Sequence, residues 1–169
     1  GGIGELVGDS VSRMGRARGP PPSCVFERVK QHGVKVAALA GTCAHAKRQA
    51  EAGAGIIIAQ GYEAGGHTGE VATMVLVPEV VDAVAPLPVL AAGGIGTGRQ
   101  ITASLALGAA GVWIRSPRLT TEAAETDPFG KPKLTKAGSR DTLVSRPLTG
   151  KHATQLRRSR VVASDGTSP

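Results

Sequence analysis

From about residue 25 onward, the chain alternates short apolar runs with stretches of helical periodicity. Four apolar runs predict strands at Val34–Leu39, Ile56–Ala59, Val89–Ala92 and Gly111–Ile114. The second run begins with three consecutive β-branched isoleucines, which is typical of a strand covered on both faces. Successive strands begin 22, 33 and 23 residues apart, counted from Val34, Ile56, Val89 and Val112. This spacing fits right-handed crossovers and predicts a parallel α/β protein, either a barrel or a doubly wound sheet.

Helices are predicted between these strands. Thr42 is expected to cap a helix that runs to about Ala52, and Pro78 is expected to open another that runs through Ala85, because proline fits the first helical position. Further helices are expected at Val25–His32, Arg99–Leu107 and Thr120–Glu125.

The chain divides into three regions by composition. Residues 1–23 are rich in Gly, Pro and Arg and are expected to be irregular; residues 24–126 carry the βα units; residues 127–169 form a basic, loop-rich segment. A complete (βα)8 barrel needs at least about 200 residues, so the middle region supplies about half of one.

Net charge and cysteine content exclude several classes of protein. The net charge is +7, and residues 91–169 hold twelve basic and five acidic residues. There the basic residues mix with Pro, Gly, Ser and Thr and lack aromatic neighbours, which indicates a solvated tail and no nucleic-acid surface. Cys24 and Cys43 have neither zinc-ligand spacing nor an activating neighbourhood, so no metal site is expected and the thiols are expected to be inert.

Neither a membrane segment nor a signal peptide is evident in the sequence. No apolar run approaches about 20 residues, and the first ten residues lack a basic start and an apolar core. We expect a cytoplasmic protein that does not bind a membrane.

The loop Gln60–Gly69 is the first candidate for chemistry. It follows the Ile56–Ala59 strand, and ligands of α/β proteins bind at the carboxyl ends of strands. Its glycines allow a ligand to approach the backbone, and His67 can take up a proton near neutral pH. The alternative is an ordinary glycine-rich loop with a solvated histidine. Glu63, the acid in the loop, is expected either to orient His67 or to serve as a cap or a solvated group.

Ala91–Gln100 and Gly111–Ser116 form the second and third candidates. The first of these runs from a strand end into a helix start, where backbone amides attract a phosphate. Its spacing fits neither a P-loop, which needs Lys and Ser/Thr where Arg99 and Gln100 stand, nor a dinucleotide fingerprint. Two consecutive strand ends of this kind resemble the phosphate site after strands seven and eight of a barrel. The chain would then hold strands five to eight, with the first half lying upstream.

Several motifs in order resemble the nitronate monooxygenases, also called 2-nitropropane dioxygenases. The matching segments are AQGYEAGGHTG from Ala59, VPEVVDAV from Val77, AAGGIGTGRQ from Ala91, ALGAAGVW from Ala106, LTTEA from Leu119 and SRDT from Ser139. The resemblance covers about residues 25–160. It implies a (βα)8 barrel that uses FMN and dioxygen to oxidise alkyl nitronates, in some members also nitroalkanes, to a carbonyl compound and nitrite.

The resemblance also assigns roles to residues. His67 matches the base that removes the proton beside the nitro group, Gln60 and Gly65 match flavin contacts, and Gly94 matches the phosphate loop. The last-strand segment that closes on FMN corresponds to Trp113, Ile114, Arg115 and Ser116. Where the family usually has Gly-Ser or Gly-Thr, this chain has Arg115, which either pairs with the phosphate or blocks its site.

Two other functions remain open at this point. One is an inactive half-barrel remnant, and the other is a related flavin barrel such as an enoyl reductase. An open half barrel also predicts a covering partner, either a second copy in a homo-oligomer or the missing half barrel, because its edges and apolar inner face are otherwise exposed.

Overall fold

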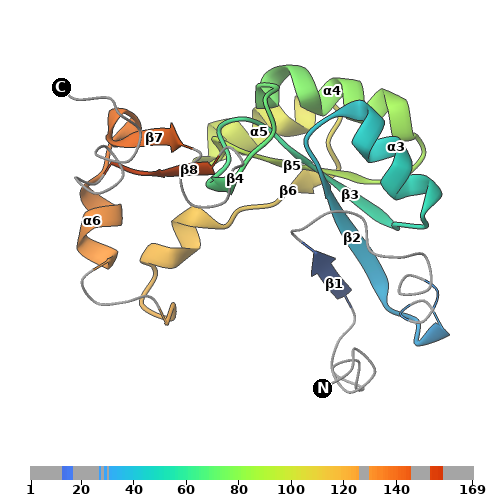
Figure 1. Ribbon diagram of the computed structural model, residues 1–169, viewed down its shortest axis with the longest axis horizontal. Helices are drawn as coiled ribbons and strands as arrows, with labels where there is room; N and C mark the ends of the chain where they lie inside the picture. Colours follow the sequence, from blue (N-terminus) through green and yellow to red (C-terminus); the bar gives the residue numbers. More distant parts are fainter. Residues whose placement is uncertain are drawn as a thin grey trace.

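The computed structural model describes residues 13–16, 27, 29, 31–125, 130–145 and 153–157. Its central element is a parallel sheet with the strand order β1-β2-β3-β5-β6 (Figure 1). The strands are β1 (Arg13–Arg16), β2 (Lys35–Ala40), β3 (Ile56–Gln60), β5 (Val89–Ala92) and β6 (Gly111–Val112). The expected parallel α/β architecture is therefore observed.

Three helices connect the strands from β2 to β6. They are α3 (Cys43–Glu51), α4 (Thr73–Val84) and α5 (Gly98–Ala106). In Figure 1, α3 and α4 lie together on one side of the sheet. Thr42 caps α3 as expected, since its hydroxyl accepts a hydrogen bond from the amide of His45 at 3.1 Å.

The start of α4 differs from the prediction. The helix begins at Thr73, and Pro78 lies inside it. A proline in a helix interior costs about 3 kcal/mol. Leu76, Val77 and Val80 are fully buried on this helix, and each such side chain contributes about 1.5–3 kcal/mol on burial. Burial of this face therefore outweighs the cost of the proline.

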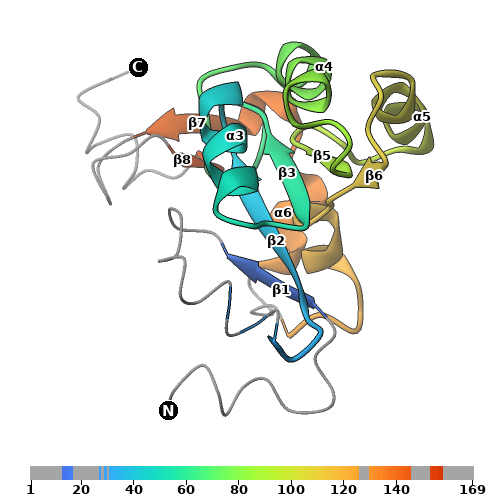
Figure 2. The ribbon, with the colours of Figure 1, turned by 90° about the vertical axis from the view of Figure 1, so that its right-hand side faces the viewer.

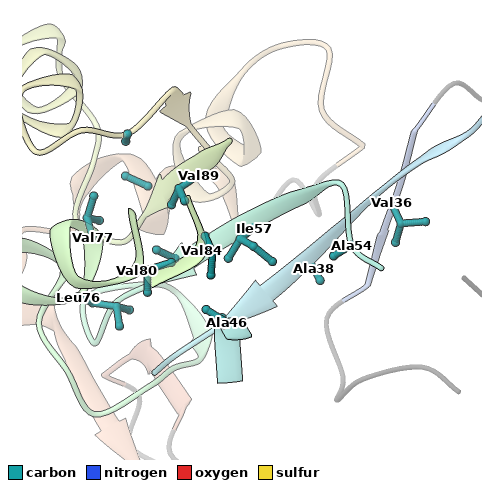
Figure 3. Close-up of a cluster of buried hydrophobic side chains, with 14 of the residues drawn as sticks. Val36, Ala38, Ala46, Ala54, Ile57, Leu76, Val77, Val80, Val84 and Val89 are labelled. Atoms are coloured by element: carbon teal, nitrogen blue, oxygen red, sulfur yellow. The ribbon is translucent and has the colours of Figure 1, made fainter. Parts of the chain in front are cut away.

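The main core lies between the sheet and its helices (Figure 3). Ile57 and Val89 from the sheet pack against Leu76, Val80 and Val84 of α4. The opposite face of the sheet carries a smaller cluster centred on Ala37, Ile58 and Ala92. Both faces of β3 are thus buried in its middle, as its β-branched run predicts.

The terminal regions contain more regular structure than expected. Figure 2 shows β1 beside β2, although β1 falls in a segment that was expected to be irregular. In the C-terminal region, the expectation of loops is wrong for α6 (Lys131–Lys136), β7 (Thr142–Ser145) and β8 (Ala153–Leu156). These strands are short and gain their partners from a distance: β8 pairs antiparallel with both β7 and β4 (Gly66–His67). The periodicity of apolar residues along the sequence does not predict strands as short as these.

Three smaller predictions can also be compared with the structure. The fourth strand ends at Val112, two residues earlier than predicted. A helical turn expected at Thr120–Glu125 lies instead at Ser116–Thr120 as a 3-10 helix, in which proline occupies an early position. Of the predicted helix at Val25–His32, residues 27, 29, 31 and 32 are described; the first three are helical, and His32 lies in a turn. The division into three domains stays a prediction.

Candidate functional site

A cavity of ≈ 900 Å³ lies at the carboxyl ends of β3, β5 and β6. Loops after all three strands line it, which is the placement that parallel strands with a common direction produce. Every site residue predicted from the sequence lines this cavity: Gln60, Gly65, His67, Gly94, Trp113, Ile114, Arg115 and Ser116. The structure therefore brings the three candidate segments together in one place.

The loop after β3 holds His67 through its backbone. The side-chain amide of Gln60 donates a hydrogen bond to the carbonyl oxygen of His67 at 2.9 Å. His67 also pairs with Ala153 across the β4–β8 ladder. The base of the loop is closed by a bond from the amide of Tyr62 to the carbonyl of Val71 at 2.8 Å. His67 is an exposed residue and lines the cavity.

Glu63 caps α4. Its Oε2 accepts hydrogen bonds from the amide and the hydroxyl of Thr73, at 2.9 and 2.7 Å. Burial alone would raise the pKa of Glu63, but these two bonds, together with a hydrogen bond to the backbone of Glu63 itself, outweigh it and lower the pKa below its ordinary value. Of the roles considered for this acid, capping is the one observed.

The glycine turn after β5 forms the second wall. Gly93 and Gly94 both have positive φ, at 120° and 65°. A little further on, the amides of Gly96 and Thr97 donate to the side-chain oxygen of Gln100, at 2.8 and 3.0 Å. This stretch of backbone therefore presents converging donors to an oxygen atom.

The third wall follows β6. The amide of Trp113 donates to the carbonyl of Ala91 at 2.8 Å, which extends the contact between β6 and β5 beyond the strand. The loops after β3 and β6 also approach each other closely: a Cβ built on Gly65 would lie 2.8 Å from Ser116 Oγ. Arg115 is exposed and lines the cavity, so its guanidinium lies at the rim of the site.

Sequence analysis missed several residues that shape this site. Thr73 is buried, and its hydroxyl contacts the carbonyl oxygen of Gly93, which links the first two walls of the cavity. Its signal was present, because Thr73, Leu76, Val77 and Val80 follow helical spacing. Two more cavity residues, Ala137 and Ser139, come from the region that was predicted to be loop-rich.

The described residues give no sign of a metal centre or a membrane helix. No group of three or more His, Cys, Asp or Glu side chains gathers there. Over the same ranges, no helix combines the length and apolar character that a membrane crossing needs. The thiol of Cys43 donates to Glu79, and burial followed by this contact raises the pKa of Cys43, which agrees with an inert thiol. Cys24 lies outside the described residues.

Comparison with known proteins gives oxidoreductases as relatives. The protein named "Putative monooxygenase Rv1533" of Mycobacterium tuberculosis is 67% identical over 147 residues, which cover 87% of this chain and 39% of the relative. A (3aS,4S,5R,7aS)-5-hydroxy-7a-methyl-1-oxo-octahydro-1H-indene-4-carboxyl-CoA dehydrogenase of Rhodococcus jostii is 41% identical, over 86% of this chain and 40% of the relative. The chain thus spans about two fifths of the length of the curated relatives it matches.

Among solved structures, the nitroalkane oxidase of Streptomyces ansochromogenes superposes with a TM-score of 0.84 at 32% identity. The superposition covers 94% of this chain and 48% of that enzyme. It supports the expected TIM-type barrel fold, whereas the half of the barrel to which the chain corresponds stays a prediction. The sequence pattern of the family described as nitronate monooxygenase matches residues 9–165. The chain belongs to the nitronate monooxygenase family.

Proposed function

We propose that this chain forms the FMN-binding and proton-abstracting part of an enzyme that oxidises alkyl nitronates with dioxygen. The products would be a carbonyl compound and nitrite, as in the resemblance described above. One observation carries the proposal: His67 and the glycine turn after β5 line the same cavity. Because the chain spans about two fifths of its curated relatives, the activity is proposed for the protein to which it corresponds.

The residues present fit FMN. Gly94 is exposed, lines the cavity and carries no side chain, so a ligand can approach its backbone closely. The cavity volume of ≈ 900 Å³ is within the range of cofactor pockets, which is roughly 300–1,000 Å³. Gly94 would hold the phosphate, and Gln60, Gly65 and the segment Trp113–Ser116 would contact the rest of the cofactor.

The protein's own contribution is position and a proton acceptor. FMN, when bound, supplies the capacity to accept electrons from the substrate. His67 would remove the proton from the carbon beside the nitro group of a nitroalkane, because histidine is the side chain that most often serves as a general base. The Gln60 side chain fixes the backbone at His67, so the imidazole starts from a defined place at the cavity wall. A positioned base of this kind is worth about 10²–10⁴ in rate.

The test compares two substrates that differ by one proton. For His67→Asn, we expect kcat/KM on a neutral nitroalkane to fall by about 10²–10⁴, with a much smaller loss on the preformed nitronate, which needs no base. His32→Asn is the matched control, because His32 is exposed and does not line the cavity. Equal losses on both substrates would refute the role of His67.

A different reaction at the same site is the second candidate. The 41% identity to a carboxyl-CoA dehydrogenase favours oxidation of a substrate that carries no nitro group. Nitrite release from a nitronate supports the first function, whereas turnover without nitrite supports the second. If added FMN changes neither its own absorption spectrum nor the fluorescence of Trp113, the chain on its own is an inactive half barrel. Trp113 is the sole tryptophan of the chain and lines the cavity.

A further inference from the structure

We propose that Thr73 is a positioning residue whose hydroxyl locks the His67 loop to the glycine turn after β5. The contacts that support this inference are all between residues of this chain. Its consequence for ligand binding rests on the proposed function.

Thr73 contacts both segments through one side chain. Its hydroxyl lies 2.7 Å from Glu63 Oε2 and 3.2 Å from the carbonyl oxygen of Gly93, and its single proton is shared between these two acceptors, with the shorter contact to Glu63. Its backbone amide donates to the same Glu63 oxygen at 2.9 Å. Glu63 belongs to the loop that carries His67, and Gly93 precedes the predicted phosphate residue Gly94. One buried hydroxyl therefore joins the two walls of the cavity.

The packing around Thr73 leaves little freedom. Thr73 is 9% exposed. A Cβ built on Gly61 would lie 2.6 Å from both the Cα and the amide nitrogen of Thr73, and one built on Gly93 would lie 2.6 Å from its hydroxyl oxygen. Both glycines are thus required for Thr73 to fit between the two strand ends. Because these contacts are so close, a displacement of either loop would also displace Thr73.

Helix capping alone does not account for this arrangement. A cap for α4 needs an acceptor for the first helical amides, and Glu63 supplies it through its bond to the Thr73 amide. The approach of the hydroxyl to Gly93 contributes nothing to the cap, because Gly93 lies 20 residues away on another strand end. The contact with Gly93 instead sets the spacing between the loop that carries His67 and the glycine turn after β5.

The experiment compares Thr73→Val, which removes the hydroxyl and keeps the shape, with Thr73→Ser, which keeps the hydroxyl. Amide hydrogen exchange is measured for residues 62–71 and 93–97. Because one bond to a charged acceptor is lost, we expect exchange to accelerate about five- to tenfold in both segments for Thr73→Val and to stay near wild type for Thr73→Ser. Glu63→Gln is a second variant, and it keeps an acceptor oxygen. Exchange should accelerate in the same two segments as in Thr73→Val, but by a smaller factor.

A second readout is the affinity for FMN, followed by quenching of Trp113 fluorescence. We expect Thr73→Val to raise the Kd about tenfold and Thr73→Ser to change it less than about twofold. If exchange changes only in the first turn of α4, or if Thr73→Ser behaves like Thr73→Val, the positioning role is refuted. If the wild-type chain binds no FMN, it forms no cofactor site on its own, and the exchange experiment still decides the role of Thr73.

Discussion

Gly61 lies at the closest contact between the loop after β3 and the start of α4. Its amide donates to the carbonyl of Ala92 at 2.9 Å, so its backbone is fixed to β5. In Gly61→Ala, the new Cβ would meet the Cα and the amide nitrogen of Thr73 at 2.6 Å, whereas ordinary contacts begin at 3.4 Å. The nearest obstructing atom is the hydroxyl oxygen of Thr73, and because the other two are backbone atoms, rotation of the side chain does not relieve the clash. The helix start must move by about 0.8 Å, which disturbs the bonds between Thr73 and Glu63.

The expected cost follows from these contacts. Overpacking of a tight site costs about 1–3 kcal/mol, and the weakened bonds to a charged carboxylate add about 1 kcal/mol. We therefore expect the free energy of unfolding to fall by about 2–4 kcal/mol. For a chain of this size, the Tm would fall by about 5–15 °C.

Thermal and urea unfolding, followed by circular dichroism, measure this loss. Gly98→Ala is the matched control, because Gly98 starts α5 and a Cβ there meets nothing within 4 Å. That variant should gain about 0.4–1 kcal/mol, since alanine restricts the unfolded chain. If Gly61→Ala unfolds within about 0.5 kcal/mol of wild type, the close packing at Thr73 is wrong.

Two further predictions concern charge. Arg115→Ala should weaken FMN binding about five- to twentyfold in a fluorescence titration, because a guanidinium at the cavity rim can pair with phosphate; tighter binding would mean that Arg115 obstructs the site. The second concerns His45, whose pKa is lowered from 6.5 by burial and then by the charge of Arg48. Below pH 6.5 the unfolded chain binds a proton that the folded chain resists, so stability should fall as the pH drops from 6.5 through the lower folded pKa. In urea unfolding between pH 7.5 and 5, His45→Gln should lack this loss of stability. If the free energy of unfolding depends on pH in the variant as it does in the wild type, the prediction is wrong.

Local sequence signals predicted the part of the fold that depends on neighbouring residues. The apolar run at Ile56–Ala59 predicted a buried strand, and Val89–Ala92 matches β5 residue for residue. Thr42 predicted the start of α3 because an N-cap acts within one turn. The cavity was also predictable, since the carboxyl ends of parallel strands share one edge and each candidate segment follows such an end.

Features that depend on distant residues were not predictable in this way. The start of α4 is fixed by Glu63, ten residues upstream, and by burial of Leu76, so the local preference of Pro78 for a helix start does not decide it. The rules for proline at a helix start describe an isolated helix. In this fold the core selects the boundary, because the apolar face that begins at Thr73 has a sheet to pack against.

The placement of His67 shows how far such dependence reaches. β4 consists of Gly66 and His67 alone, and a strand of this length is not stable without further support. Its support comes from Ala153 and Thr154 of β8, which lie more than 80 residues away, and from the side chain of Gln60. The motif around His67 therefore supplies the imidazole but does not by itself hold it in place. A segment that composition marks as basic and loop-rich holds the candidate base in position, so the proposed chemistry depends on the C-terminal region as well as on the βα units.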